Sequence, residues 1–360
     1  MLRPLFGFGL VGLLIAAVAC ESPTDTSDPS PPDSTVVQKG ARLLAIAISD
    51  RADGDFNVAY DQAVQAGMEV TSLSLSWDDL ETSPGVYDPA IDFLAIGADY
   101  YGSRGTQLAL GINPIDTNNN RVPGHLSGLA WDDPAMIQAF EDLLDWALPK
   151  VAGVDLVYLS IGNEIDATLS SAADWAAYQA FFEATAAHAR SLRSGLRVGS
   201  KVTHGGLMGG SAVSAASLNG ATDIVLTTFY PLNSDFTIQA PTAAGEALDA
   251  IATAYPGRPV MFAEIGTPST SQCGSSEALQ AAFVREAFAA WDRHATQVEM
   301  LEFVWMHDIS QDALNTYESY YGLSDACFLD YLATLGLKDA QGVDKPAWVA
   351  LTEEAAARGW

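Results

Sequence analysis

The stretch Leu156-Val157-Tyr158-Leu159-Ser160-Ile161-Gly162-Asn163-Glu164 is an apolar run that ends in a carboxylate. The stretch Pro259-Val260-Met261-Phe262-Ala263-Glu264-Ile265-Gly266 has the same character. Short, nearly continuous apolar runs are typical of strands that are buried on both faces of a parallel sheet. A carboxylate at the end of such a strand lies at the carboxyl edge of the sheet, where α/β barrels carry their active sites. We therefore predict that Glu164 and Glu264 face one pocket.

Eight runs along the chain have the character of buried strands. They are Ala41–Ile48, Val70–Ser76, Gln107–Ile112, Leu156–Gly162, Arg197–Val202, Ile224–Phe229, Pro259–Ala263 and Met300–Trp305. Segments with helical spacing separate them, for example Phe56–Ala66, Pro134–Ala147, Ala172–Leu192, Ala243–Ala254, Ser276–Ala290 and Lys345–Ala357. Eight such units favour a closed α/β barrel, a (β/α)8 TIM barrel, over an open doubly wound sheet. We predict one such domain over residues 39–360, without a Gly-rich dinucleotide loop after the first strand.

The first residues have the features of an export signal. Met1-Leu2-Arg3 is a basic start, and the apolar run Leu5–Ala19 is too short to span a bilayer. Ala17-Val18-Ala19-Cys20 resembles a bacterial lipobox, which implies that residues 1–19 are a signal peptide and that Cys20 is acylated. An ordinary signal peptide with an incidental cysteine is the alternative. Residues 20–38 then form a disordered tether rich in Ser, Thr, Pro and Asp. We expect an exported monomer, anchored by lipid at the bacterial cell surface or outer membrane.

Charge and cysteine content limit the partners of the protein. The formal net charge is −28, so the surface repels the phosphates of nucleic acids and disfavours polyanionic substrates. Cys273 and Cys327 lie in predicted loops, and an exported compartment permits a disulfide between them. No C-x-x-C or H-x-x-x-H pattern occurs, and we therefore predict no metal site and no cofactor.

The order of the two glutamates resembles the large clan of retaining glycoside hydrolases with (β/α)8 barrels, a clan A-like pattern. In that clan an Asn-Glu pair ends strand four and supplies the acid/base, and a second Glu ends strand seven and is the nucleophile. Asn163-Glu164 and Glu264 match these places. The segment Trp77–Asp88 is similar to the clan's W-x-x-x-E-x-x-x-G-x-Y/F-D stretch, and Lys345-Pro346-Ala347-Trp348 resembles the start of its last barrel helix.

The resemblance implies roles for further residues. Tyr230 ends strand six, where the clan often has a tyrosine that hydrogen-bonds the nucleophile, and Trp305 ends strand eight, where the clan has an aromatic floor under the sugar. Asn163 would donate a hydrogen bond to the sugar 2-hydroxyl. Trp77 would offer a second flat face to sugar C–H groups. A position in the core is the alternative for both tryptophans.

Other polar residues at predicted strand ends are candidates to line the pocket, with a structural hydrogen-bonding role as the alternative. They are Asp50, Asn113, His204 and His307, and the loop Asp116–Trp131 adds Arg121 and His125. Two features depart from the clan pattern. Ser74-Leu75-Ser76-Trp77 contains no arginine after strand two, and Ile165 replaces the common proline after Asn-Glu.

The resemblance implies a retaining glycosidase that acts by double displacement. A retaining pair has carboxyl groups about 5–5.5 Å apart, and the charge of Glu264 would raise the pKa of Glu164. We expect an endo-acting enzyme whose partner is a neutral β-linked polysaccharide or oligosaccharide. A non-catalytic glycan-binding lipoprotein on the same barrel is the main alternative. A lyase or aldolase ranks third, because no lysine lies at a strand end in a convincing position to form a Schiff base. Lys201, between Ser200 and Val202, is the only lysine within a predicted strand.

Overall fold

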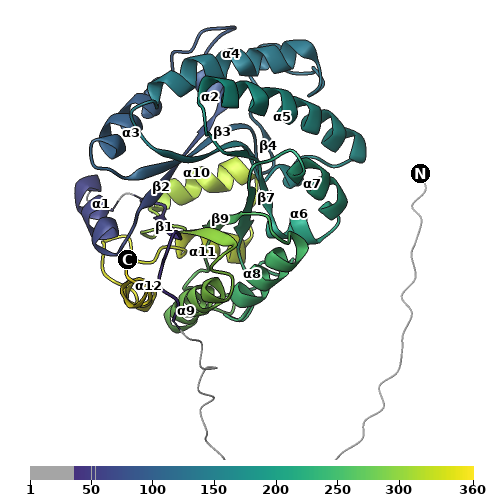
Figure 1. Cartoon of the computed structure of the whole chain (residues 1–360). Coiled ribbons are helices and arrows are strands. Elements are labelled where there is room, and N and C mark those ends of the chain that lie inside the picture. The colour runs from purple at the N-terminus through teal and green to yellow at the C-terminus, as the bar shows by residue number, and fades with distance from the viewer. Residues whose placement is uncertain (1–35, 50, 53) are drawn as a thin grey trace, which may run out of the picture. The chain divides into compact units, whose positions relative to one another are not determined.

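A parallel sheet that curves into a ring is the framework of the protein, which Figure 1 shows end-on in a computed structural model. The structure describes residues 36–49, 51–52 and 54–360. The predicted signal peptide, Cys20, residues 20–35 of the predicted tether, and Asp50 lie outside the described residues.

The strands follow the ring in chain order. They are β1 (Leu43–Ile46), β2 (Val70–Ser76), β3 (Gln107–Asp116), β5 (Leu156–Asn163), β6 (Val198–Gly199), β7 (Lys201–Thr203), β8 (Val225–Phe229), β9 (Val260–Ile265) and β10 (Val298–Phe303). The sheet order is β6-β5-β3-β2-β1-β10-β9-β8-β7, with every neighbouring pair on this path parallel. Since β6 and β7 are two halves of one position broken at Ser200, they join β5 to β8 and bring the ring to eight positions. The prediction of a TIM barrel is confirmed.

Helices surround the strands (Figure 1). They are α1 (Phe56–Gln65), α2 (Trp77–Leu80), α3 (Phe93–Gly102), α4 (Pro134–Lys150), α5 (Ala172–Leu192), α6 (His204–Met208), α7 (Ala212–Asn219), α8 (Ala243–Ala254), α9 (Glu277–Arg293), α10 (Gln311–Tyr321), α11 (Ala326–Ala333) and α12 (Pro346–Arg358). An Asp or Ser side chain caps several of them by accepting a backbone N–H of the first turn, which satisfies a donor that would otherwise lack a partner. These caps are Asp55, Asp92, Asp133, Ser171, Ser276, Ser310 and Asp325. No helix among the described residues combines the length and apolar character needed to cross a bilayer.

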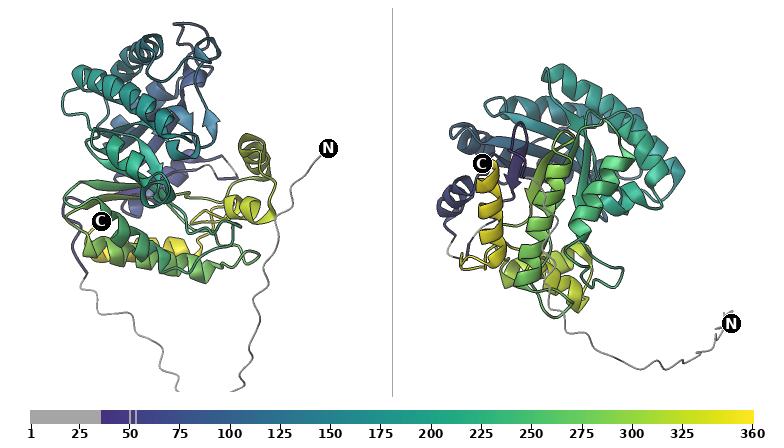
Figure 2. Two further views of the ribbon diagram at one scale, coloured as in Figure 1. Left: turned by 90° about the vertical axis from the view of Figure 1, so that its right-hand side faces the viewer. Right: turned by 60° about the horizontal axis from the view of Figure 1, so that its bottom comes forward.

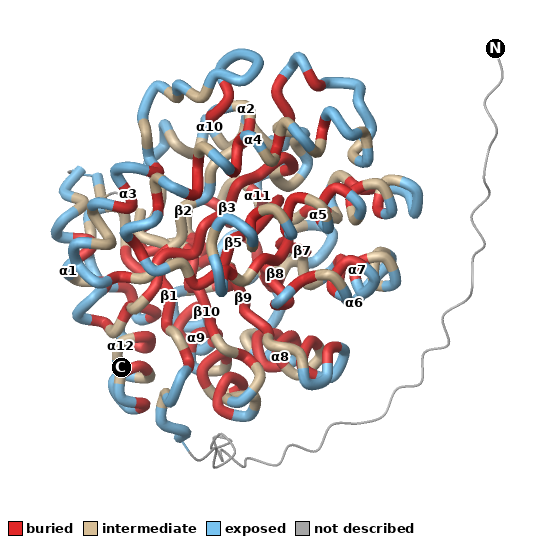
Figure 3. The backbone as a smooth tube through the Cα atoms, turned by 45° about the horizontal axis from the view of Figure 1, so that its top comes forward, coloured by how far each residue is buried: buried red, intermediate tan, exposed pale blue. Residues whose placement is uncertain are grey.

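Alternation along the strands separates two apolar layers. In β1, Leu44 and Ile46 belong to the large cluster between strands and helices, whereas Ala45 belongs to a smaller cluster of strand residues. Successive side chains of a strand point to opposite faces, so the smaller cluster fills the interior of the ring. Figure 3 shows the result as buried strands within exposed outer helix surfaces. The interior of the ring is therefore a packed core.

An inserted segment between β10 and α12 stands apart from the ring of helices. Helices α10 and α11 belong to this insertion, and they project to one side of the barrel in Figure 2. Phe328, Tyr331 and Leu332 of α11 form a separate apolar cluster against which Trp305 packs. Cys273, in the loop after β9, forms a disulfide with Cys327 of α11, with 5.6 Å between their Cα atoms. The insertion is therefore attached covalently to the loop that follows the strand carrying Glu264.

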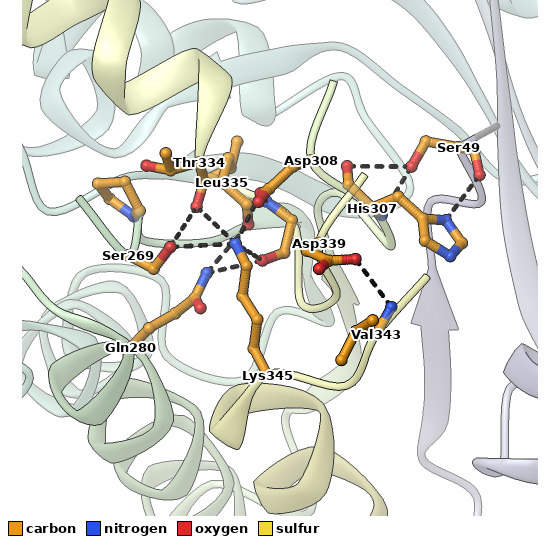
Figure 4. A network of polar contacts seen from close by, with 12 residues as sticks. Ser49, Ser269, Gln280, His307, Asp308, Thr334, Leu335, Asp339, Val343 and Lys345 are labelled. Carbon is orange, nitrogen blue, oxygen red and sulfur yellow. Dashed lines mark hydrogen bonds and ion pairs between the residues drawn. The ribbon is translucent and has the colours of Figure 1, made fainter. Parts of the chain in front are cut away.

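A buried lysine anchors the chain where it returns from the insertion to the barrel (Figure 4). Lys345 Nζ lies 2.6 Å from Asp308 Oδ1 and also donates to Ser269 Oγ and to the carbonyl oxygen of Gly336. The side chains of Lys345 and Asp308 are only 6% and 15% exposed. Burial raises the pKa of Asp308 to about 6 and lowers the pKa of Lys345, so the ion pair depends on its surrounding hydrogen bonds.

We predict that Lys345→Met lowers the free energy of unfolding by about 3–5 kcal/mol, because it leaves the Asp308 carboxylate buried without its cation. Lys150→Met is the matched control, since Lys150 pairs with Asp92 and both side chains are near one-third exposed. We expect Lys150→Met to lower the free energy of unfolding by about 1 kcal/mol or less. Urea unfolding, which adds no salt, measures both values. Equal losses in the two variants would contradict the structural role of Lys345.

Candidate active site

One cavity of about 740 Å³ opens at the carboxyl ends of the barrel strands. Its residues come from the ends of β2, β3, β5, β7 and β9 and from the inserted helices α10 and α11. Both Glu164 and Glu264 line it. The structure therefore places in one cavity two carboxylates that are 100 positions apart in the chain.

Glu164 follows the last residue of β5 and adopts a left-handed backbone conformation, with φ 47° and ψ 46°. Such a conformation costs free energy for a residue other than glycine, and it clusters at functional sites. Thr228 Oγ1 donates to Glu164 Oε1 over 2.6 Å, and Thr117 Oγ1 donates to Glu164 Oε2 over 3.0 Å. Two threonines thus hold one rotamer of the carboxyl group and point it into the cavity.

Gly162 shows why the chain turns at this place. Its φ is +84°, and a Cβ atom there would lie 2.5 Å from Tyr178 Oη and 2.6 Å from Ile165 Cγ2. A side chain at this position would therefore combine backbone strain with a clash. The glycine lets β5 end against α5 and orients the next two residues, Asn163 and Glu164, towards the cavity.

Glu264 lies within the last two residues of β9 and receives one donor on each oxygen. Tyr230 Oη donates to Oε2 over 2.7 Å, and Lys201 Nζ lies 3.2 Å from Oε1. Burial and the charge of Glu264 raise the pKa of the Tyr230 hydroxyl well above its ordinary value, so it remains a donor. A cation and a hydroxyl donor together stabilise the ionised carboxylate.

The two carboxyl groups differ in electrostatic environment. Burial and then the charge of Glu264 raise the pKa of Glu164 to about 7, against the lowering effect of the hydrogen bonds from Thr228 and Thr117. Glu264 instead has the cation Lys201 beside it. The surroundings thus favour the neutral form of Glu164 and place a cation beside Glu264, the difference required of a proton donor and a nucleophile.

Asn163 and Asn113 both line the cavity. Asn163 Nδ2 donates to Asp116 Oδ1 over 2.9 Å, and Asn113 Nδ2 donates to Ser74 Oγ over 2.7 Å. The Oδ1 atom of each asparagine is buried and has no hydrogen-bond partner among the described residues. These hydrogen bonds fix the orientation of both amide groups at the cavity. Donation from Asn163 to a sugar hydroxyl stays a prediction.

Aromatic side chains form the wall of the cavity opposite the polar strand ends. Trp305 lines it and stacks on Tyr317 of α10, with ring centroids 5.4 Å apart and an interplanar angle of 22°. Further aromatic lining comes from Tyr320, Tyr321, Phe328 and Tyr331. Flat apolar faces beside hydroxyl donors suit a ligand that has both C–H and hydroxyl surfaces.

The structure corrects the predictions for two residues. Trp77 is fully buried: its Nε1 donates to Glu81 Oε2 over 2.8 Å and its ring packs edge-on against Phe140 of α4, outside the cavity. The chain enters α2 directly after β2, and this turn directs the indole outwards, between strands and helices. His204 starts α6 and packs beside Phe229 with a centroid distance of 5.1 Å, also outside the cavity lining. Burial lowers its pKa.

The remaining candidate residues lie in different places: Arg121 in the cavity, His125 at the surface and His307 in the core. Arg121 lines the cavity and forms ion pairs with Asp78 and Asp79. His125 lies 3.4 Å from Glu81, outside the lining. His307 is fully buried and its Nδ1 lies 2.9 Å from the carbonyl oxygen of Ser49.

Sequence reasoning missed several residues that contact the two glutamates. Lys201, Thr117 and Thr228 touch them directly, and Asp116 contacts Asn163. Tyr317, Tyr320 and Tyr321 come from α10, a helix that sequence reasoning did not identify. Of these residues, only Lys201 gave a signal in the sequence, as the single lysine within a predicted strand. Among the described residues, no group of three or more His, Cys, Asp or Glu is arranged to hold a metal ion.

No family model matches the chain, and no curated protein matches it. A GH5_18 protein from Bifidobacterium longum subsp. longum, in complex with Manβ1-4GlcNAc, has a TM-score of 0.67 at 15% identity over 88% of this chain and 78% of its own. An exo-β-1,4-mannosidase from Opitutaceae bacterium strain TAV5 has a TM-score of 0.66 at 18% identity, over 91% of this chain and 62% of its own. A family 39 glycoside hydrolase from Bacteroides cellulosilyticus WH2 has a TM-score of 0.62 at 13% identity, over 89% of this chain and 65% of its own. The chain thus shares the (β/α)8 fold of clan A glycoside hydrolases, as its resemblance predicted.

We predict that the Glu164 carboxyl group titrates near pH 7 and that Glu264→Gln moves the midpoint to lower pH, because that substitution removes the neighbouring negative charge. Carbon-13 NMR of the protein labelled at glutamate Cδ measures the midpoint, and Glu164→Gln identifies the resonance. Glu299→Gln is the control, since Glu299 is 38% exposed and pairs with Arg197. A midpoint that is the same with and without the Glu264 charge would show that the two carboxyl groups do not interact.

Proposed function

We propose that the protein is a retaining glycoside hydrolase that cleaves neutral β-linked oligosaccharides or polysaccharides by double displacement. The observation that carries this proposal is the pair of carboxyl groups in one cavity, with the pKa of Glu164 raised to about 7 and Glu264 held by Lys201 and Tyr230. Glycosidic bond cleavage requires a proton donor and a carboxylate on opposite sides of the scissile bond.

In the first step the Glu264 carboxylate attacks the anomeric carbon and the glycosidic C–O bond breaks. Glu164 gives its proton to the departing oxygen, which leaves as an alcohol. The products are a glycosyl ester on Glu264 and an ionised Glu164. Protonation by Glu164 matters most for sugar leaving groups, because an alkoxide is a poor leaving group.

In the second step Glu164 accepts a proton from a water molecule, whose oxygen bonds to the anomeric carbon. The ester bond to Glu264 breaks and its carboxylate is restored. Esterification removes the Glu264 charge that raised the pKa of Glu164, so Glu164 holds its proton before the first step and is ionised, as a base, for the second. Both anomeric inversions together retain the configuration.

The substrate class follows from the cavity surface. Tyr317, Tyr320, Tyr321 and Trp305 provide aromatic faces, and Asn113 and Asn163 add polar groups to the cavity lining. With a net charge of −28, a neutral glycan is preferred over an anionic one. Because one similar structure holds Manβ1-4GlcNAc and another is a mannosidase, β-mannosides and β-glucosides are the first substrates to test.

The position of the insertion favours cleavage at the ends of a glycan chain, besides the endo cleavage expected from the sequence. Seen end-on, α10 crosses the middle of the strand ring (Figure 1). Two hydrogen bonds join α10 to the end of β3 and the residues after it. Tyr320 Oη donates to Asp116 Oδ2 over 2.5 Å, and Asn119 Nδ2 donates to the carbonyl oxygen of Tyr320. A bridge over the mouth limits the passage of a long chain, which supports cleavage at chain ends.

Export and lipid anchoring at Cys20 belong to the same proposal, with residues 20–38 as the tether to the barrel and a monomer as the active form. An anchored glycosidase at the cell surface would act on glycans outside the cell.

We predict that the purified protein hydrolyses at least one aryl β-glycoside and that Glu264→Gly lowers the rate by at least about 10³-fold, as expected for loss of a nucleophile. Azide restores turnover in this variant as a glycosyl azide, since the small anion fits the space left by the side chain. Proton NMR of the first product shows the retained anomer in the wild-type protein. Initial inversion would contradict the nucleophile role of Glu264. Binding without hydrolysis across a broad glycan panel would instead favour a glycan-binding protein.

We predict that a β-linked hexasaccharide labelled at its reducing end loses one or two sugars at a time if α10 blocks the mouth. Mass spectrometry at early times gives the sizes of the products. Tyr320→Ala, which removes the hydroxyl bond to Asp116, should increase the share of internal cuts, whereas Tyr100→Ala on the outer helix α3 serves as the control. Random internal products from the wild-type protein would favour the endo mode expected from the sequence.

A further inference from the structure

A buried cation stands beside the proposed nucleophile. The Lys201 side chain is 4% exposed, and its Nζ lies 3.2 Å from Glu264 Oε1. Among the described residues that line the cavity, the lysine and arginine side chains are Lys201 and Arg121, and Arg121 is occupied by Asp78 and Asp79. The serines that β2 contributes to the cavity, Ser72, Ser74 and Ser76, carry no charge. Lys201 is thus the cation available to Glu264.

A second buried carboxylate, Glu302, interacts electrostatically with this lysine. Glu302 of β10 is fully buried and does not line the cavity. Met300 of the same strand belongs to the interior cluster, so strand alternation points Glu302 into the ring as well. Its carboxylate lies close to Ser72 without a hydrogen bond of standard geometry to any described residue. A fully buried carboxylate needs a compensating charge, and Lys201 is the cation that acts on it.

The electrostatics agree with a shared cation. Burial lowers the pKa of Lys201, but the charges of Glu264, Tyr158 and Glu302 outweigh burial and raise it above its ordinary value. Burial raises the pKa of Glu302 to about 7, and Lys201 opposes that shift. Both carboxylates therefore favour the protonated form of Lys201 in the free protein.

We propose that Lys201 and Glu302 are a positioning pair, in which Lys201 keeps Glu264 ionised and oriented and Glu302 keeps Lys201 charged when Glu264 is esterified. The second half of this inference rests on the proposed function. In the free enzyme Lys201 has two carboxylates beside it. In the glycosyl-enzyme Glu264 is neutral, and without Glu302 the ammonium group would be buried without a counter-ion, which is unfavourable.

The titratable groups that face Glu264 come from every element packed around it. They are Tyr158 of β5, Glu164 directly after β5, Lys201 of β7, Tyr230 after β8, Glu302 of β10, Tyr317 and Tyr321 of α10, and Tyr331 of α11. Lys201 is the one cation in this set of described residues. Removal of any other member would leave the carboxylate with its cation, so Lys201 has a distinct effect on the charge of Glu264.

The first experiment measures the pH dependence of Lys201→Met. Without the cation the Glu264 carboxylate takes up a proton at higher pH, so the acid limb of kcat/KM for an aryl β-glycoside moves to higher pH. We expect kcat/KM at the optimum to fall about 100-fold, as for a displaced reacting group, and Lys201→Arg to recover part of it. Lys345→Met is the control: it loses stability but keeps the wild-type pH profile. An unchanged profile in Lys201→Met would overturn the proposal and leave Lys201 a structural residue.

The same coupling can be followed without turnover. In protein labelled at glutamate Cδ, the Glu264 resonance, identified with Glu264→Gln, should titrate at higher pH in Lys201→Met than in the wild-type chain. This measurement separates the two hypotheses. If the wild-type protein hydrolyses no glycoside, the proposed function fails, while the titration still supports or refutes the charge coupling.

The second experiment tests Glu302 through the covalent intermediate. Glu302→Gln should slow labelling by a 2-deoxy-2-fluoro glycoside about tenfold, because the ester would leave Lys201 without a counter-ion. The double variant Lys201→Met/Glu302→Gln should unfold at higher urea concentration than Lys201→Met, since the second change removes an unpaired buried carboxylate. Labelling at the wild-type rate in Glu302→Gln, or additive losses of stability in the double variant, would refute the pairing of Glu302 with Lys201.

Discussion

Closure of the parallel sheet is the constraint on which the site depends. Because the paired strands along the ring run in one direction, their carboxyl ends meet on one side of the barrel. Residues from β5, β7, β8 and β9 can then contact each other although long helices separate them in sequence. Thr228 reaches Glu164 and Lys201 reaches Glu264 across this mouth. No local element could bring these groups together.

Burial gives those contacts their chemical effect. A carboxyl group taken out of water resists ionisation, and Glu164 with its neighbouring charge has a pKa of about 7. Glu264 receives a donor on each oxygen, one from Lys201 and one from Tyr230. The two groups have the same covalent structure, and their surroundings alone make one a candidate acid and the other a candidate nucleophile. The disulfide and the Lys345 network hold the aromatic insertion beside them.

Many of the strands and helices of the barrel could be predicted from the sequence. The strand Val70–Ser76 has the predicted ends, and helix Ala172–Leu192 begins and ends as expected, because strand burial and helix capping are local signals. The predicted strand Arg197–Val202 is broken at Ser200, and β3 continues to Asp116 rather than ending at Ile112. Strand ends depend on what the neighbouring strand offers for pairing, which sequence patterns do not contain.

The sequence by itself determined the barrel, its strand order and the two glutamates at strand ends, since these follow from apolar periodicity and the position of charged residues. Only the tertiary structure decided which other side chains meet them. Trp77 turned into the core while Trp305 lines the cavity, although both follow apolar strands. Lys201 became the cation of Glu264 because ring closure brings β7 near β9, two positions away in the ring. Such contacts depend on distance in space, and a linear pattern records only distance along the chain.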